Sequence, residues 1–521
     1  MAEPLTPLLI ASEPGCKRDG TVLESRNYVD NQWARYALRR GLPRKMGGYR
    51  RLTNELSGIT RGMHVYDQNL NTYTHAGWSD GLERFTIDMN GNVSAIADRT
   101  PVGFTADPDN LWQFDSLYDG TATTTAILAH AAPNLSDIAA STDAPVYSGD
   151  ITSTAALTAT ASPSVSGGVF ALGPYAVSYG NFGIVNYSTV NSVGGSWTSV
   201  RPAASKLVFG LQIRAGAGNG PSGLIWGVDQ LLRMTFVGAS AVFNFDSITT
   251  GYSILSSQAI IEYDGIYYWP GIDHFLMFNG VIQEVENGMN LNWFYDNLNF
   301  AAAQKAFTLK VPRWGEIWFC YPRGTATECT HAVIYNVRLS RIFGYNVWYD
   351  TELPNGGRSC GQYARVFRSP LMTGVVADPT TLKYLLWQQE FQTDEIDGPS
   401  VRAIQSYFET NALCLATPAQ GTGNNKSIYI EYIEPDAVQT GNMTMQIVGS
   451  PSNARAPEVS GPIKTMYAPT AAGLSADQQV IYTQTELRQP RFRFESNTTG
   501  GFYQMGNTLA QVKPGDERIT S

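Results

Sequence analysis

Tyr263-Asp264-Gly265-Ile266-Tyr267-Tyr268-Trp269, followed by Phe275-Leu276-Met277-Phe278-Asn279-Gly280-Val281-Ile282, places two aromatic and β-branched runs around tight turns. Such residues favour β-strands. An Asn-Gly pair between strand-like runs is the strongest short-range signal for a β-hairpin. A second Asn-Gly pair, within residues 85–93, has the same setting. Both stretches therefore predict antiparallel hairpins.

Similar runs recur along the middle of the chain. They begin near residues 63, 168, 224, 263, 316 and 382, with spacings of roughly 40 to 100 residues, and the lower end matches a four-stranded propeller blade. We therefore predict a mainly β fold in which residues 58–400 form a β-propeller of about six blades with insertions. One insertion is expected near residues 121–167, a segment rich in Ala, Ser and Thr. It could be a loop, a subdomain or a channel lining.

The composition agrees with this fold class. The 521 residues include 11 Trp, 27 Tyr and 22 Phe, with 50 Gly and 27 Pro to break the strands. Charged residues make up only 16 % of the chain, against about 25 % in a typical domain. Because the centres of subunit interfaces are depleted in charge, the shortage indicates extensive contact with other subunits.

The pattern changes after residue 400. Short strands are expected at residues 428–433, 443–448, 480–485 and 491–495, between Gly, Pro, Asn and Ser turns. Residues 401–521 are therefore predicted to be an antiparallel, sandwich-like β domain, against which the N-terminal arm is expected to pack. One helix is predicted at residues 290–310.

The N-terminal arm, residues 1–57, differs in charge from the rest. Residues 1–51 hold ten Lys or Arg and five Asp or Glu, which gives this segment a charge of +5. The whole chain has a net charge of −9, so the other residues together carry −14. A basic arm on an acidic body favours docking against an acidic protein surface, with a nucleic-acid patch or a solvated face as alternatives. The residues predicted to make these assembly contacts are Trp33, Arg39, Arg40, Arg44, Lys45 and Tyr49.

Motifs for catalysis, metals or cofactors are weak, so no cofactor and no metal are expected. The five His are isolated from one another, and the five Cys are scattered without metal spacing, which favours free thiols. Residues 218–223 match G-x-G-x-x-G between strand-like runs, and residues 421–427 resemble a P-loop without its Gly before Lys426. Both are interpreted as loops, because phosphate binding at these motifs needs a following helix.

Paired carboxylates leave an enzymatic alternative open, because glycan hydrolases use two acids across a bond. The candidates are Asp264 with Asp273, and the group Asp394, Glu395 and Asp397. Asp is also common in hairpin turns, so we expect that the chain is not an enzyme. Neither a signal peptide nor a membrane span is predicted.

The two ends of the chain resemble a known family. The arm contains Tyr28-Val29-Asp30-Asn31-Gln32-Trp33-Ala34-Arg35-Tyr36 and Pro43-Arg44-Lys45-Met46-Gly47-Gly48-Tyr49-Arg50. The other end contains Arg491-Phe492-Arg493-Phe494-Glu495-Ser496-Asn497, Gly500-Gly501-Phe502-Tyr503-Gln504-Met505-Gly506 and Pro514-Gly515-Asp516. These segments resemble the tail nozzle (tubular tail, or packaged-DNA stabilisation) proteins of short-tailed bacteriophages.

The resemblance implies a structural virion protein, with a β-propeller in each subunit. Six subunits would form a channel below the portal and its head-to-tail adaptor ring, in contact with tail fibre, spike or needle proteins. Genomic double-stranded DNA would be retained and then ejected through it. The expected location is the virion tail, after synthesis in the bacterial cytoplasm. The alternatives are a propeller glycan hydrolase or depolymerase and a receptor-binding tail protein.

Overall fold

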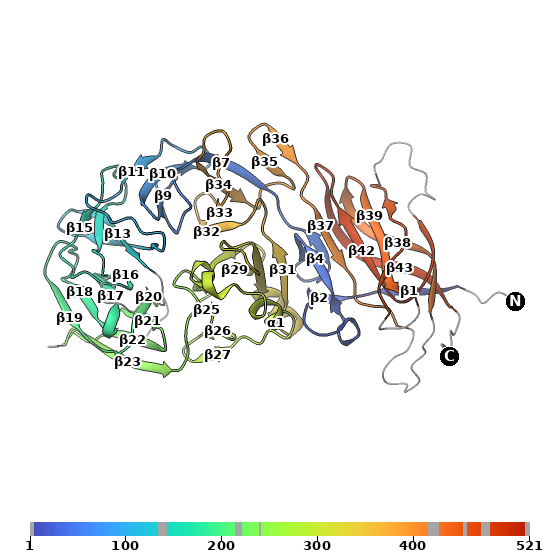
Figure 1. The fold of residues 1–521 in the computed structure, drawn as a ribbon, viewed down its shortest axis with the longest axis horizontal. Helices are drawn as coiled ribbons and strands as arrows, with labels where there is room; N and C mark the ends of the chain where they lie inside the picture. The colour runs from blue at the N-terminus through green and yellow to red at the C-terminus, as the bar shows by residue number, and fades with distance from the viewer. Residues whose placement is uncertain are drawn as a thin grey trace.

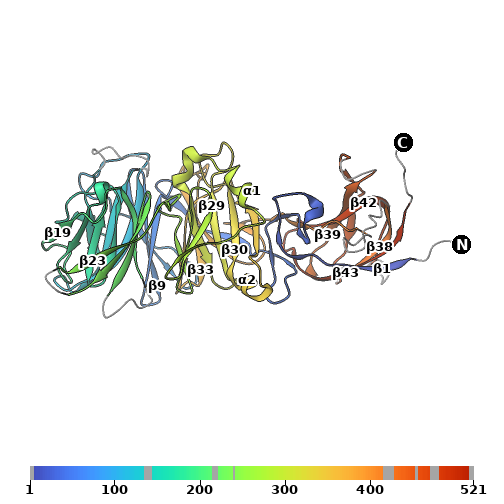
Figure 2. The same cartoon turned by 90° about the horizontal axis from the view of Figure 1, so that it is seen from below.

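A computed structural model gives the fold of the chain (Figure 1). It describes residues 5–133, 143–213, 221–238, 241–414, 427–451, 456–469 and 480–515. Of the loops predicted at residues 218–223 and 421–427, residues 218–220 and 421–426 lie outside these ranges, and residues 222 and 223 begin strand β21 (Ser222–Gly227). Two parts lie side by side along the long axis of the molecule, a propeller and an antiparallel sheet domain (Figures 1 and 2).

The propeller has seven blades, each built on four antiparallel strands. In the first six blades the innermost strand comes first in the chain, and neighbouring innermost strands pack around a common axis. The innermost strands are β8 (Gly62–Gln68), β12 (Leu111–Asp119), β16 (Gly168–Leu172), β20 (Leu207–Gln212), β24 (Ile261–Tyr263), β28 (Phe307–Val311) and β32 (Arg358–Ala364).

The outer strands of the first four blades follow in chain order. They are β9 (Asn71–Trp78), β10 (Gly81–Asp88) and β11 (Ala97–Asp98); β13 (Thr124–Ala132), β14 (Tyr147–Asp150) and β15 (Thr158–Ala159); β17 (Tyr175–Tyr179), β18 (Val185–Ser188) and β19 (Trp197–Val200); β21 (Ser222–Gly227), β22 (Gln230–Phe236) and β23 (Phe243–Thr250).

The last three blades follow the same plan. Their outer strands are β25 (Ile266–Pro270), β26 (Phe275–Phe278) and β27 (Ile282–Glu284); β29 (Glu316–Tyr321), β30 (His331–Asn336) and β31 (Trp348–Glu352); β33 (Ser369–Gly374) and β34 (Tyr384–Gln389). Helix α2 (Val337–Phe343) lies between β30 and β31. It begins at Asn336, whose side chain accepts from Leu339 N, and ends at Gly344 in the left-handed conformation.

The predicted number of six blades is wrong because the second blade was not recognised. Its strands β13 to β15 fall in the segment interpreted as an insertion at residues 121–167. The outer strands are short and read YSGD and TA, with a single aromatic and a single β-branched residue between them, unlike the runs that mark the other blades. The described part of this segment is therefore blade and not insertion.

The seventh blade is closed by the N-terminal arm. Strand β7 (Tyr49–Leu56) pairs antiparallel with β34, so the outermost strand of the last blade precedes the first blade in sequence. Strands β35 (Glu395–Asp397) and β36 (Ser400–Arg402) extend the same sheet from the other side of β7. Both ends of the propeller segment are thus joined in one sheet, which ties the ring shut.

The sheet domain combines both ends of the chain and is nearly closed. Its order is β4-β37-β42-β38-β43-β6-β5, so the arm supplies both terminal strands of the path. Only Trp33 separates those two strands. The strands are β4 (Asp30–Gln32), β5 (Ala34–Tyr36), β6 (Pro43–Lys45), β37 (Ser406–Glu409), β38 (Ile428–Thr440), β42 (Ile481–Ser496) and β43 (Phe502–Pro514). The predicted packing of the arm on the C-terminal domain is confirmed.

Shorter strands complete the domain. Strand β1 (Thr6–Ile10) pairs with β43, and β39 (Met443–Ser450) pairs with β40 (Val459–Ser460), β41 (Lys464–Met466) and β42. The arm also forms a parallel pair between β2 (Glu13–Cys16) and β3 (Asn27–Tyr28). Instead of two strands at residues 480–485 and 491–495, the structure has the single strand β42. It has positive φ at Gln484 and Gln489.

The single helix predicted at residues 290–310 is wrong. The segment holds α1 (Leu291–Tyr295), a 3₁₀ turn (Phe300–Lys305) and then strand β28. Asn299 interrupts the helix, because its side chain accepts from Ala301 N and starts the second turn. Among the described residues, no helix is long and apolar enough to cross a membrane.

Candidate functional site

The predicted assembly residues Arg39 and Arg40 lie in an exposed turn of the arm. Both side chains are exposed, and Arg39 has a φ of 71° in the turn between β5 and β6. A left-handed turn projects its side chains away from the strands on either side. Two adjacent guanidinium groups are therefore available at the surface of the subunit, as a docking contact requires.

Arg44 is half-buried between the two domains. Its guanidinium donates to Gln504 Oε1 at 3.0 Å and lies over the rings of Trp314 and Phe502, 4.8 and 4.9 Å from their centroids. Trp314 belongs to the propeller, whereas Phe502 and Gln504 belong to the sheet domain. Within the subunit, Arg44 thus joins the domains through two cation–π contacts and a hydrogen bond.

Lys45 is buried inside the sheet domain. Its Nζ donates to the carbonyl oxygen of Gly501 at 2.9 Å. Burial lowers the pKa of this ammonium group to about 8, although the carboxylate of Asp394 opposes the shift. A charged lysine in this place is thus tolerated at a cost to stability.

The lowered pKa of Lys45 predicts an alkaline gain in stability. Between about pH 8 and pH 10.5 the unfolded chain still binds the proton that the folded chain has released, so the free energy of unfolding should rise with pH. The difference between wild type and Lys45→Met isolates this effect in urea titrations, because other titrating groups are common to both. A difference that stays constant over this interval would refute the assignment.

Trp33 and Tyr49 are buried at the junction of the two domains. Trp33 packs edge-on against Tyr49 and Trp318, with ring centroids 5.9 and 6.0 Å away, and its indole donates to Gly47 O at 3.0 Å. The Tyr49 hydroxyl donates to Glu395 Oε2 at 3.0 Å. These side chains have partners within the chain. Among the six predicted contacts, Arg39 and Arg40 are the exposed ones.

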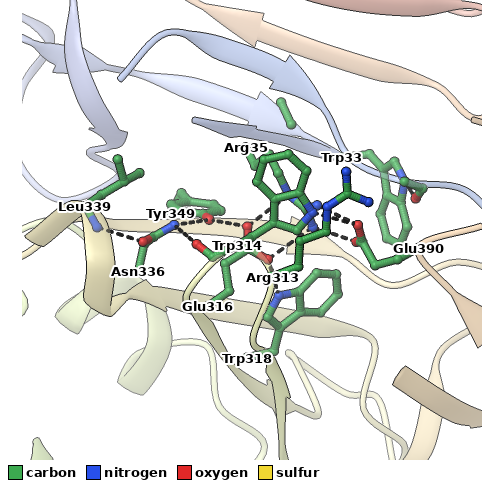
Figure 3. A network of polar contacts seen from close by, with 12 residues as sticks. Trp33, Arg35, Arg313, Trp314, Glu316, Trp318, Asn336, Leu339, Tyr349 and Glu390 are labelled. Atoms are coloured by element: carbon green, nitrogen blue, oxygen red, sulfur yellow. Dashed lines mark hydrogen bonds and ion pairs between the residues drawn. The ribbon is translucent and has the colours of Figure 1, made fainter. Parts of the chain in front are cut away.

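A buried ion network ties the arm to the propeller at this junction (Figure 3). Arg35, 1 % exposed, donates from both terminal nitrogens to the carboxylate of Glu390 at 2.6 Å each. Its Nη2 donates to Glu316 Oε2 at 3.1 Å, and its Nε lies 2.9 Å from Glu316 Oε1. The two acids come from the two last blades, so one arginine holds both to the arm.

Glu316 is fully buried and further held by neutral donors. Trp318 Nε1 and the Tyr349 hydroxyl donate to it at 2.9 and 2.8 Å. Burial raises the pKa of this carboxyl, and Arg35 opposes the rise. Neither Arg35 nor Glu316 is among the predicted assembly residues, although Arg35 lies within the family-like segment of the arm.

The acids considered as a catalytic pair do not meet. Asp264 and Asp273 lie in the turns before and after β25, at opposite ends of that strand. Five strand residues alone rise about 16 Å, which exceeds the roughly 5–10 Å needed between glycosidase carboxyls. Asp264 is paired with Arg341 at 3.2 Å, and Asp273 with the adjacent His274.

The acids of residues 394–397 hold the arm and the sheet domain in place. Asp394 accepts from Gly500 N at 2.7 Å, and Asp397 pairs with Arg51 of β7 at 2.7 Å and with Arg402 at 3.2 Å. Glu395 accepts from Tyr49 and pairs with Arg402. All three carboxylates contact basic or hydrogen-bond donor groups of this chain, so each of them has a structural role.

The histidines and cysteines do not form a metal site in the described ranges. No group of three or more His, Cys, Asp or Glu gathers there. Cys16, Cys320, Cys329 and Cys360 are buried free thiols, and Cys414 is an exposed one. Burial lowers the pKa of His64, His130 and His331 to about 4, so these imidazoles are neutral near pH 7.

An axial cavity lies along the centre of the propeller. Its wider part, about 750 Å³, is lined at the C-terminal ends of all seven innermost strands. A narrower part of about 250 Å³ lies towards their N-terminal ends and shares lining residues with the wider part. The cavity cannot be predicted from local sequence patterns, because its lining residues are spread over some 300 positions of the chain.

One side chain crosses the axis at the narrow end. Gln258 precedes β24 in the fifth blade, and its Nε2 donates to the carbonyl oxygen of Arg61 in the first blade and to that of Trp112 in the second, the latter at 3.4 Å. The cavity is thereby bridged at the N-terminal ends of the innermost strands. The wider part of the cavity opens towards the other end of the axis.

Comparison with known proteins adds no relative. No model of a protein family matches the sequence, and a search of curated proteins returns no significant match.

Proposed function

We propose that this chain is a structural subunit of a short-tailed phage tail, a nozzle protein that assembles with five copies of itself around a channel for DNA. The proposal rests on where the two family-like segments of the sequence lie in the fold. The two family-like segments, near residues 28–50 and 491–516, supply β4 to β6, β42 and β43 of one sheet domain. The resemblance thus covers parts of a single folded unit, although those parts lie at opposite ends of the chain.

Charge supports the same proposal. The chain carries a net charge of −9 and only 16 % charged residues. A strongly basic wall would bind phosphates and hold DNA back, whereas an acidic or neutral wall lets it pass. A channel for double-stranded DNA would lie between subunits, because Gln258 crosses the propeller's own axis.

Localisation tests the proposal directly. Antibody raised against this chain, applied with gold label to intact particles of the phage whose genome encodes it, should bind at one vertex on the tail. Antibody against a capsid protein is the control for access to the particle. Absence of label from both intact and tail-exposed particles would remove the chain from the virion and direct attention to glycan hydrolysis or receptor binding.

The exposed arginine turn predicts a specific assembly defect. Arg39→Glu with Arg40→Glu should leave the subunit folded, because both side chains are exposed, and should reduce tailed particles at least tenfold by reversing the charge of the docking contact. The measurement is the fraction of tailed particles by electron microscopy after complementation of a deletion.

The matched control makes the same change in charge on the propeller. Arg201→Glu with Lys383→Glu alters two exposed basic residues outside the arm. This variant should form tails normally. If the arm variant also assembles normally, or if both variants fail alike, the arginine turn is not the docking contact.

A further inference from the structure

The axial cavity of the propeller has the size and the chemistry of a binding site. Its wider part measures about 750 Å³, within the roughly 300–1,000 Å³ typical of small-molecule sites. All seven innermost strands contribute to it, so its walls belong to the most constrained part of the fold. This cavity is separate from the junction residues and from the exposed arginine turn.

Aromatic side chains gather at the bridged end of the cavity, and polar side chains line both of its parts. Trp112 and Phe114 stack at a centroid distance of 5.6 Å and an interplanar angle of 6°, and both line the narrow part with Phe209. Towards the open end the lining includes Asp115, Gln212, Gln362 and Tyr363. A site of this kind buries the apolar face of a ligand and fixes its orientation with a few polar groups.

The charges favour a neutral ligand with hydroxyl donors. The acids Asp67, Asp115 and Glu262 outnumber the bases Lys310 and Arg365, and Lys310 is already paired with Glu262 at 3.0 Å. Asp115 accepts from Ala171 N at 2.8 Å and from Ser116 N at 2.7 Å, which fixes its carboxylate against the wall. An anion such as a phosphate would meet excess negative charge, whereas hydroxyl groups can donate to carboxylates and amides.

We infer that the open end of the propeller axis binds a neutral saccharide. Carboxylate and amide oxygens of Asp115, Gln212 and Gln362 would accept from sugar hydroxyls. The rings of Tyr66 and Tyr363, which line the wider part, would cover the apolar face of the sugar. The site requires no residue of the docking arm. It is therefore independent of the proposed role in the tail and can be tested on the isolated chain.

The test uses saturation-transfer NMR and calorimetry on the full chain. The probes are glucose, galactose, mannose, N-acetylglucosamine, maltose and lactose, with inorganic phosphate as the anionic probe. At least one sugar should bind, and Gln362→Ala should weaken it at least tenfold, because Gln362 is exposed to the cavity. Asp115→Asn should weaken it similarly where the variant retains the wild-type melting temperature.

The matched control is Asp264→Asn, which removes an exposed carboxylate from an outer turn of the propeller. Its affinity for the same sugar should equal that of the wild type. Binding of none of the sugars overturns the inference. Sugar binding unaffected by Gln362→Ala, or weakened equally by Asp264→Asn, also overturns it, and so does binding of phosphate in place of sugar.

Discussion

Arg35→Met should lower the free energy of unfolding by about 3–5 kcal/mol, the usual cost of removing one partner from a buried ion pair. Arg35 and Glu316 are 1 % and 0 % exposed as side chains, and Glu390 shares the same guanidinium. Without the arginine, the fully buried carboxylate of Glu316 and the partly buried carboxylate of Glu390 lose the cation that they share. The measurement is urea unfolding at pH 7.5, monitored by tryptophan fluorescence.

The deficit of this variant should depend on pH. Burial already raises the pKa of Glu316, and loss of Arg35 removes the charge that opposes the rise. A carboxyl whose folded pKa is raised favours the folded state at low pH and loses that contribution as pH increases. The deficit should therefore be smaller at pH 5 than at pH 8.

Two controls separate burial of charge from loss of packing. The triple variant Arg35→Met, Glu316→Gln, Glu390→Gln removes all three charges and should recover part of the loss. Arg341→Met breaks the exposed pair with Asp264 and should cost less than about 1 kcal/mol. An Arg35→Met deficit as small as that of Arg341→Met would refute the assigned role of the network.

Leu56→Ala should cost about 2–5 kcal/mol, because Leu56 is fully buried at the end of the closing strand β7. Its cluster includes Phe85 of the first blade and Leu386 of the last. The substitution therefore opens a cavity at the place where the ring is joined. Thermal unfolding and urea titration give the size of the loss.

The exposed neighbour Glu55 on the same strand provides the matched control. Glu55→Ala keeps the strand pairing and removes no buried surface, so its effect should stay within about 0.5 kcal/mol. Equal effects of the two substitutions would show that β7 does not close the propeller in solution.

The class of fold could be predicted from the sequence because it depends on local patterns. Aromatic runs around Asn-Gly turns mark hairpins directly, as in residues 275–282, which hold β26 and part of β27. The second blade could not be predicted in this way, because its outer strands β14 and β15 consist of YSGD and TA. Their strand conformation comes from the pairing of β14 with β13 and of β15 with β14, which no local pattern shows.

Long-range pairing also explains the error in β42. Pro490 cannot donate to a sheet hydrogen bond, so two separate strands were expected on either side of it. The structure instead lets one strand change partners there. Leu487 pairs with Ile428 of β38, whereas Arg491 pairs with Val448 of β39. The positive φ of Gln489 marks the change.

The candidate contacts of the arm could be predicted only in part. Six basic and aromatic residues were selected, and the structure leaves Arg39 and Arg40 exposed while it buries Trp33, Lys45 and Tyr49. Arg35 is not among the predicted contacts, because its role depends on partners that are distant in the sequence. Glu316 and Glu390 lie 281 and 355 positions away. The axial cavity is likewise assembled from seven distant strands.

The most direct measurement is a reconstruction of the tail vertex by electron cryomicroscopy, at a resolution that traces strands. We expect six copies of the subunit, arranged around a channel wide enough for duplex DNA. In each copy a seven-bladed propeller is joined to a nearly closed sheet. A well-resolved tail without this subunit, or one in which it does not surround the channel, would contradict the proposed function.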